Sequence, residues 1–218
     1  MQNSLLWSNK EQVLYKKQPD TSHSSNGTSN WFHFDPWSLT WIASPHPTDT
    51  LEIVSAQDAL KHLKGKLRSL PVGVIGPQDA TAKELSFAES LGTSLAKLGL
   101  QLLCGGKSGV MQAVAKGYHE AGKLAIGILP DEDWRLANDF IGIPIATGIG
   151  RARNAIIAQA CPVLVAIGGG FGTLSEMAYG KQFEHLVLAL GETPYVPGVI
   201  YCDDIDEVCQ LIVEYWLR

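Results

Sequence analysis

The sequence has no apolar run of membrane-spanning length, although 45% of its 218 residues are hydrophobic. Gly or Pro interrupts the longest apolar stretches, and residues 1–14 contain no apolar run after a basic start. A membrane helix needs about 20 mainly apolar residues, and a secretory signal has a basic start before its apolar core. We therefore expect a cytoplasmic protein with no membrane partner, long enough for one substantial core and an appendage.

The sequence also has no dense stripe of Lys and Arg, and its formal net charge is -5. Sequence-independent binding of nucleic acid depends on many basic side chains that neutralise phosphates. The charge balance therefore excludes a broad nucleic-acid surface, and we expect no nucleic-acid partner. The charge balance is still compatible with a local pocket that binds one phosphate group.

Cysteines are few and widely separated: Cys104, Cys161, Cys202 and Cys209. Most lie within apolar runs, which is typical of reduced thiols in a core. Their spacing matches neither a zinc site nor a disulfide framework. We expect no metal site.

The composition changes near Ser55. Up to that point the chain is rich in Ser, Asn, Pro and His. Five aromatic residues there alternate in a way that fits a small antiparallel ribbon: Trp31, Phe32, Phe34, Trp37 and Trp41. We assign residues 1–55 to an N-terminal aromatic-rich appendage, formed by a β ribbon, and residues 56–218 to a ligand-binding domain.

Strands, glycine turns and helices alternate from residue 71 onward. The expected strands are apolar without alternation, which indicates burial on both faces: "PVGVIGP", "LQLLCGG", "LAIGILP", "IGIPIAT", "VLVAIGGG" and "HLVLAL". The expected helices cover residues 55–70, 81–98, 108–121, 151–160, 173–183 and 205–217. This order predicts an α/β fold with a doubly wound parallel sheet.

Glycines follow three of these strands, at Gly76, at Gly105 and Gly106, and from Gly168 to Gly172. In a doubly wound sheet such loops lie along one edge and form the ligand crevice. Free N–H groups at the helix starts favour an anion, and glycine lets it approach the main chain. The loops predict a phosphorylated ligand; the alternative is that the glycines only permit tight turns. A Walker A loop is excluded because Gln101 stands where it needs glycine.

Three motifs in this order carry a family resemblance: "CGGKSGVMQAVAKGYHEAG", "TGIGRARNAIIAQAC" and "AIGGGFGTLSE". Together they resemble a group of Rossmann-like proteins over residues 71–190. The group includes the LOG-type cytokinin-activating phosphoribohydrolases and the molybdenum cofactor carrier proteins. The fold is shared by both, so the residues must distinguish them.

The resemblance implies two alternative functions. The LOG-type enzymes carry Pro-Gly-Gly-x-Gly-Thr-x-x-Glu, and Glu176 and Arg153 match their catalytic positions. Ile167, Ser175 and Asn154 depart from the enzyme pattern, so the favoured function is non-catalytic binding, storage and transfer of a phosphorylated pterin, the molybdenum cofactor. The alternative is hydrolysis of the N-glycosidic bond of a nucleoside 5'-monophosphate, with a nucleotide as ligand.

The same resemblance, together with the glycine loops, predicts the ligand-binding residues. They are Gly76, Gly105, Gly106, Lys107, Ser108, Gly109, Arg153, Asn154, Gly168, Gly169, Gly170, Gly172, Thr173 and Glu176. Glu176 has a second interpretation, because Thr173 to Glu176 also fits a capping box. Arg153 is expected to meet a phosphate or a partner subunit. Relatives imply a homodimer or homotetramer, with molybdoenzymes as acceptors of the cofactor.

Overall fold

A computed structural model describes residues 4–18 and 30–218. The chain divides into two compact units. One comprises residues 1–68 and 213–218, and the other comprises residues 69–212. The predicted boundary lay at residue 55, before the helix that belongs to the first unit. Each unit has its own sheet, and the glycine loops all belong to the second.

The first unit contains a five-stranded antiparallel sheet in the order β4-β3-β2-β1-β5. It is larger than the ribbon that the aromatic pattern predicted. Its strands are β1 (Leu5–Ser8), β2 (Val13–Lys17), β3 (Trp31–Asp35), β4 (Thr40–Ser44) and β5 (Leu51–Val54), followed by helix α1 (Ala56–His62). Four of the five predicted aromatic residues lie on β3 and β4, and Trp37 lies in the turn between them.

Buried side chains lie on several strands of this sheet, without strict alternation along each strand. Phe34 and Trp41 are directly opposite each other in the β3–β4 pair, with ring centroids 5.2 Å apart. Trp7 is fully buried and stacks on His62 of α1 at 4.6 Å. Among the five predicted aromatic residues, Phe34 alone is fully buried and Trp37 is exposed, so the sheet shows aromatic pairs and no aromatic cluster among the described residues.

The second unit is an α/β unit with a seven-stranded sheet in the order β12-β11-β10-β6-β7-β8-β9, in which every described pair is parallel. This confirms the predicted parallel sheet. The strands are β6 (Pro71–Ile75), β7 (Gln101–Cys104), β8 (Ala125–Leu129), β9 (Ile141–Ala146), β10 (Val163–Ile167), β11 (Leu186–Leu190) and β12 (Ile200–Cys202). The chain builds outward from β6 in one direction and then from β10 in the other.

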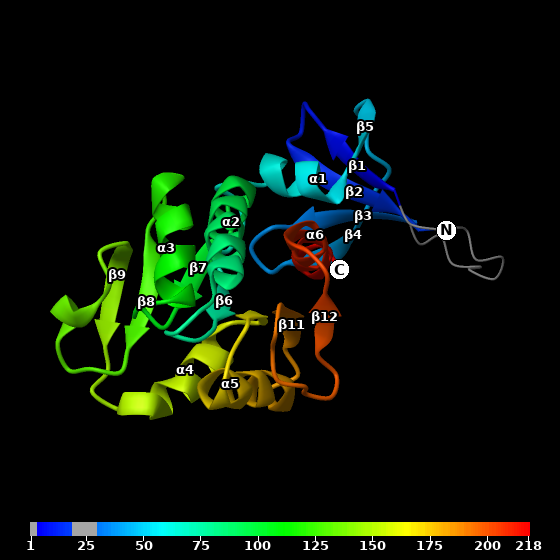
Figure 1. Cartoon of the computed structure of the whole chain (residues 1–218). Coiled ribbons are helices and arrows are strands. Elements are labelled where there is room, and N and C mark those ends of the chain that lie inside the picture. The colour runs from blue at the N-terminus through cyan, green and yellow to red at the C-terminus, as the bar shows by residue number, and fades with distance from the viewer. Residues whose placement is uncertain (1–3, 19–29) are drawn as a thin grey trace. The chain divides into compact units, whose positions relative to one another are not determined.

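Helices lie on both sides of this sheet, with α2 and α3 on one side and α4 and α5 on the other (Figure 1). The helices are α2 (Ala82–Leu98), α3 (Val110–Glu120), α4 (Arg153–Ala160), α5 (Phe171–Gln182) and α6 (Ile205–Trp216), with short 3-10 turns η1 (Trp134–Leu136) and η2 (Gly150–Ala152). No helix in the described ranges combines the length and apolar character that crossing a membrane requires.

Burial of the central strands explains their uninterrupted apolar sequence. All five residues of β10 are buried, since helices pack on both faces of the sheet. The core beneath α4 and α5 contains Ile75, Leu103, Ile128, Ile157, Ala158, Cys161, Leu164, Ala166, Met177, Val187, Ala189 and Val196. All four cysteines are free and buried, as their apolar surroundings predicted. The rigid core fixes the ends of the strands, where the glycine loops begin.

Candidate functional site

A pocket of about 500 Å³ lies at the carboxyl edge of the parallel sheet. Its walls come from the ends of β6 and β7, from η2 and the start of α4, and from the first turns of α5. The sheet order reverses between β6 and β10, which are neighbours in space. This is the position where open α/β sheets bind ligands.

The start of α5 faces the pocket without a capping side chain. Gly170 is the N-cap residue and makes no side-chain hydrogen bond. The first intrahelical bond runs from the Leu174 N–H to the Gly170 carbonyl. The N–H groups of Phe171, Gly172 and Thr173 therefore have no acceptor within the helix. Free N–H groups and the positive end of the helix dipole favour an anion here.

Gly168 is required by the structure of the loop that precedes α5. Its φ is +59°, and an added Cβ would lie only 1.8 Å from Oε1 of Glu84. Glu84 belongs to the capping box of α2, in which the Thr81 N–H donates to its carboxylate at 2.7 Å. A capping box therefore forms at the start of α2. Its carboxylate also supports the glycine loop of the site.

Gly109 fixes the wall of the pocket formed by Pro77 and Gln78. Its φ is +70°, and a Cβ there would lie 2.2 Å from the Gln78 carbonyl oxygen. The next residue, Val110, donates its N–H to the Pro77 carbonyl at 3.1 Å. Gly109 therefore shapes the loop after β6 and is absent from the pocket lining.

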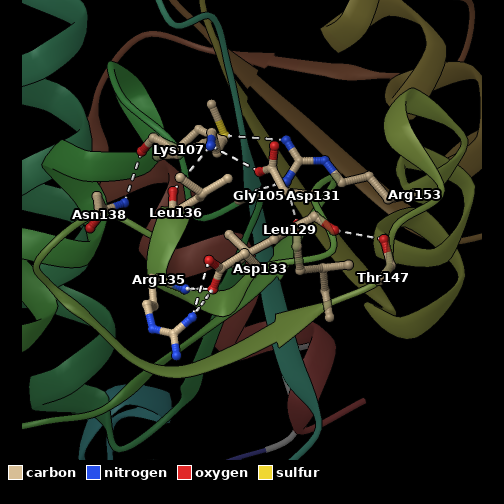
Figure 2. A network of polar contacts seen from close by, with 12 residues as sticks. Gly105, Lys107, Leu129, Asp131, Asp133, Arg135, Leu136, Asn138, Thr147 and Arg153 are labelled. Carbon is tan, nitrogen blue, oxygen red and sulfur yellow. Dashed lines mark hydrogen bonds and ion pairs between the residues drawn. The ribbon is translucent and has the colours of Figure 1, made fainter.

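Arg153 lines the pocket, but its guanidinium is bonded to the protein. The side chain is 8% exposed, and Nη1 donates to the carbonyls of Gly105 and Ile128. Nη2 lies 4.0 Å from Sδ of Met111. Burial lowers the pKa of Arg153, and the nearby Glu176 carboxyl opposes that change. The arginine thus joins the ends of two strands to α4 (Figure 2).

Glu176 is 8% exposed and lines the pocket, yet it makes no hydrogen bond or ion pair with any described residue. Burial raises its pKa to about 8, although Arg153 acts in the opposite direction. The capping-box interpretation of Glu176 is wrong, because α5 begins at Phe171 and Thr173 lies inside the helix. The capping pattern is present in the sequence, but the N-cap is Gly170, three residues before Thr173.

Asn154 and Ser175 connect α4 to α5 at the edge of the pocket. The Asn154 Nδ2 donates to Ser175 Oγ at 3.2 Å and to the Gly172 carbonyl at 3.4 Å. Ser175 Oγ donates in turn to the Gly172 carbonyl at 2.7 Å. The position where LOG-type enzymes carry a second acid therefore holds a hydroxyl group that orients the first turn of α5.

Lys107 lies outside the pocket lining, in a separate polar network (Figure 2). Its Nζ is 2.9 Å from Oδ2 of Asp131 and donates to the Leu136 carbonyl at 3.0 Å. Asn138 Nδ2 donates to the Lys107 carbonyl at 2.8 Å. These contacts hold the loop after β7 against the segment after β8.

Eight of the fourteen residues predicted to bind the ligand line the pocket: Gly76, Gly105, Arg153, Asn154, Gly170, Gly172, Thr173 and Glu176. Six lie outside its lining: Gly106, Lys107, Ser108, Gly109, Gly168 and Gly169. Among the residues that the prediction omitted are Gln78, Arg151, Phe171 and Tyr179. Arg151 is exposed and has no hydrogen bond or ion pair to any described residue. The sequence signal that could have identified Arg151 is its position two residues before Arg153 in "GRARN".

No group of three or more His, Cys, Asp or Glu side chains capable of holding a metal ion occurs within residues 4–18 and 30–218. The pocket instead offers backbone N–H groups, one exposed arginine and one carboxyl group. This donor set suits an anionic group at the helix start.

Comparison with known proteins places the second unit in a family. Residues 69–209 match the SLOG cluster4 family. An uncharacterized protein of Archaeoglobus fulgidus is 41% identical over 133 residues, which cover 61% of this chain and 87% of that protein. The cytokinin riboside 5'-monophosphate phosphoribohydrolase LOG3 of Arabidopsis thaliana is 30% identical over 117 residues, 52% of this chain and 54% of the enzyme. The match thus spans about half the length of that enzyme.

A solved structure with similar architecture is that of the molybdenum cofactor carrier protein of Chlamydomonas reinhardtii. It has a TM-score of 0.63 and 34% sequence identity, and the match covers 69% of this chain and all of the carrier (100%).

Proposed function

The chain belongs to the SLOG cluster4 family, and we propose that it binds, stores and transfers a phosphorylated pterin, the molybdenum cofactor, without changing it. Similarity to the molybdenum cofactor carrier protein over that protein's whole length supports this choice. The observation that carries the proposal is the composition of the pocket: Glu176 is the only carboxyl group among the described residues that line it.

A single buried carboxyl is a poor set of groups for glycosidic hydrolysis. That reaction requires stabilisation of a developing oxocarbenium ion and a group that activates water or protonates the leaving base. Burial keeps most of Glu176 protonated near neutral pH, since its pKa is raised to about 8. Arg153 is bonded to two backbone carbonyls. The pocket therefore supplies binding groups and lacks an ionised carboxylate for catalysis.

The phosphate of the ligand meets the start of α5 in this proposal. The N–H groups of the first turn have no intrahelical acceptor, and Arg151 is an exposed cation on the pocket wall. Both favour a dianionic group over a neutral one. The pterin then extends along the wall that includes Gln78 and Tyr179.

Hydrolysis of a nucleoside 5'-monophosphate is the second candidate. One observation favours it: Arg153 and Glu176, which match the catalytic positions of LOG-type enzymes, both line the same pocket. A protonated Glu176 is suited to donate a proton to a leaving base. Ser175 forms hydrogen bonds with Asn154 and Gly172 where those enzymes have a second acid, so this candidate lacks a group to activate water.

The two candidates are separated by one pair of measurements. The purified chain is incubated with AMP and N6-isopentenyl-AMP, and free base is measured by liquid chromatography. Molybdopterin released from a molybdoenzyme is then added under anaerobic conditions, and its binding is followed by fluorescence. We expect binding of molybdopterin and no release of base. Base release that stops in Glu176→Gln, with nucleotide binding retained, would establish the enzyme instead.

We also propose that the chain forms a homodimer or homotetramer and transfers the cofactor to molybdoenzyme acceptors. Ile156 of α4 is 43% exposed and Tyr179 of α5 is 38% exposed. These helices lie together on one side of the parallel sheet. Exposed apolar side chains on neighbouring helices favour association with a second copy.

A further inference from the structure

Glu176 is a buried carboxyl group whose hydrogen-bonding capacity is unused in the free protein. It is 8% exposed and makes no hydrogen bond or ion pair with a described residue. Buried polar groups are almost always hydrogen-bonded, because an unsatisfied group loses its water without replacement. Because Glu176 lines the pocket, water or a ligand in the pocket is the hydrogen-bond partner available to its carboxyl group.

The direction of the helix places this carboxyl near the proposed anion site. Side chains of a helix tilt toward its N-terminus and lie over the residues three and four positions earlier. For Glu176 these residues are Thr173 and Gly172, which belong to the uncapped first turn of α5. A Cβ at Gly172 would have only the Asn154 side chain near it, at 4.0 Å. The first turn of α5 and Glu176 therefore line the same pocket, and the position of a Gly172 Cβ is open apart from Asn154.

We propose that Glu176 in its neutral form donates a hydrogen bond to the oxyanion held at the start of α5, and that ionisation of Glu176 releases the anion. The inference rests on the anion site of the proposed function. A neutral carboxyl complements an anionic oxygen, whereas a carboxylate beside the same oxygen has no proton to donate and repels it.

Three titratable groups interact electrostatically with Glu176, and the protonation of Glu176 itself sets the charge beside the proposed anion. Arg153 of α4 is the cation that lowers its pKa, and Nη1 of Arg153 donates to the Gly105 and Ile128 carbonyls. Cys104 at the end of β7 and Cys161 after α4 also interact with it electrostatically, and burial raises the pKa of both thiols. The first turn of α5 carries no acidic residue. Glu176 is therefore the one carboxyl group among the described lining residues, and its pKa of about 8 makes it change charge above neutral pH.

Sulfate is the probe that tests this inference, because it keeps its charge throughout the pH range in which phosphate titrates. Its affinity is measured by isothermal titration calorimetry at about pH 7 and about pH 9. Since the pKa of Glu176 is about 8, we expect the affinity of the unchanged protein to fall about tenfold between these values. Glu176→Gln should bind sulfate at both with less than about a twofold change, because its amide does not ionise in this range.

Glu192→Gln is the matched control, since Glu192 is an exposed carboxylate outside the pocket lining. It should show the same pH dependence as the unchanged protein. Proton uptake gives a second measurement that needs no variant: at about pH 9, each sulfate bound should take up about one proton, seen by titration in two buffers of different ionisation enthalpy.

The remaining outcomes overturn the inference. Equal sulfate affinity at both pH values, or an equal loss in Glu176→Gln, would show that Glu176 does not control the anion. No sulfate binding at either pH would overturn the anion site as well. Binding of molybdopterin is measured separately, so failure of the carrier proposal is distinguished from failure of the pH dependence.

Discussion

Replacing Glu176 by Gln should stabilise the protein increasingly as the pH rises. Burial raises the pKa of this carboxyl from its ordinary 4.5 to about 8 in the folded protein. The folded state therefore holds the proton more tightly than the unfolded state. The stabilising contribution is complete below about pH 4.5, is lost progressively up to about pH 8, and changes little above it. Gln carries no such proton, so its contribution does not vary with pH.

The size of this change in unfolding free energy follows from the same difference in pKa between the folded and unfolded states. Each pH unit between the two pKa values changes the free energy of unfolding by about 1.4 kcal/mol. The loss at neutral pH is then about 3 kcal/mol, and the largest possible loss above pH 8 is about 5 kcal/mol. Relaxation of the surrounding pocket reduces both values, so we expect Glu176→Gln to gain about 2 kcal/mol relative to the unchanged protein between about pH 5 and pH 8.

The assay is urea unfolding followed by far-ultraviolet circular dichroism at several pH values. The quantity compared is the difference in unfolding free energy between Glu176→Gln and the unchanged protein, because the other carboxylates contribute equally to both. Glu192→Gln serves as control, since Glu192 is exposed. A difference that stays constant from about pH 5 to about pH 8, within about 0.5 kcal/mol, would refute the argument that Glu176 is held neutral by burial.

Three further predictions concern the glycine loop and the assembly. Gly168→Ala should lower the unfolding free energy by about 2 to 3 kcal/mol in urea unfolding, because its φ is +59° and its Cβ would displace the Glu84 carboxylate from the cap of α2. Gly170→Val should lower the unfolding free energy by about 1 kcal/mol or less, since no atom lies within 4 Å of an added Cβ. The same substitution should lower sulfate affinity at least about tenfold, because the Val side chain covers the free N–H groups. Unchanged sulfate affinity would contradict the anion site. Light scattering should give the mass of a dimer or tetramer, and Ile156→Asp should lower it; a monomeric mass for the unchanged protein would remove the basis for assembly through α4.

The parallel sheet was predictable because its signal is local and strong. Strand β10 is apolar at every position, and burial on both faces requires that pattern. The strand β12 was not predicted, since it has only three residues and follows a loop with two prolines. The strands β1 and β2 were also missed, because each is short and mixes apolar with polar residues. Such strands depend on their neighbours in the sheet, which the sequence does not display.

The site was predictable in position but not in the use of its side chains. Glycines at the strand ends indicated the edge of the sheet, and eight predicted residues line the pocket there. The pattern in "GRARN" could not show that Arg153 turns inward to two backbone carbonyls while Arg151 stays exposed on the pocket wall. That choice depends on the ends of β7 and β8, which are distant in sequence.

The inward arginine explains why Glu176 lacks a partner. A guanidinium and a carboxylate buried together usually form an ion pair that lowers the pKa of the acid. Here Nη1 of Arg153 bonds to the Gly105 and Ile128 carbonyls, so it holds the loop after β7 to β8 instead of neutralising Glu176. Burial consequently raises the pKa of Glu176 to about 8, and the carboxyl lines the same pocket as the uncapped start of α5. Under the proposed carrier function, this pocket accepts a doubly charged ligand without an opposing carboxylate, and that function rests on these side chains because the fold is shared with the hydrolases.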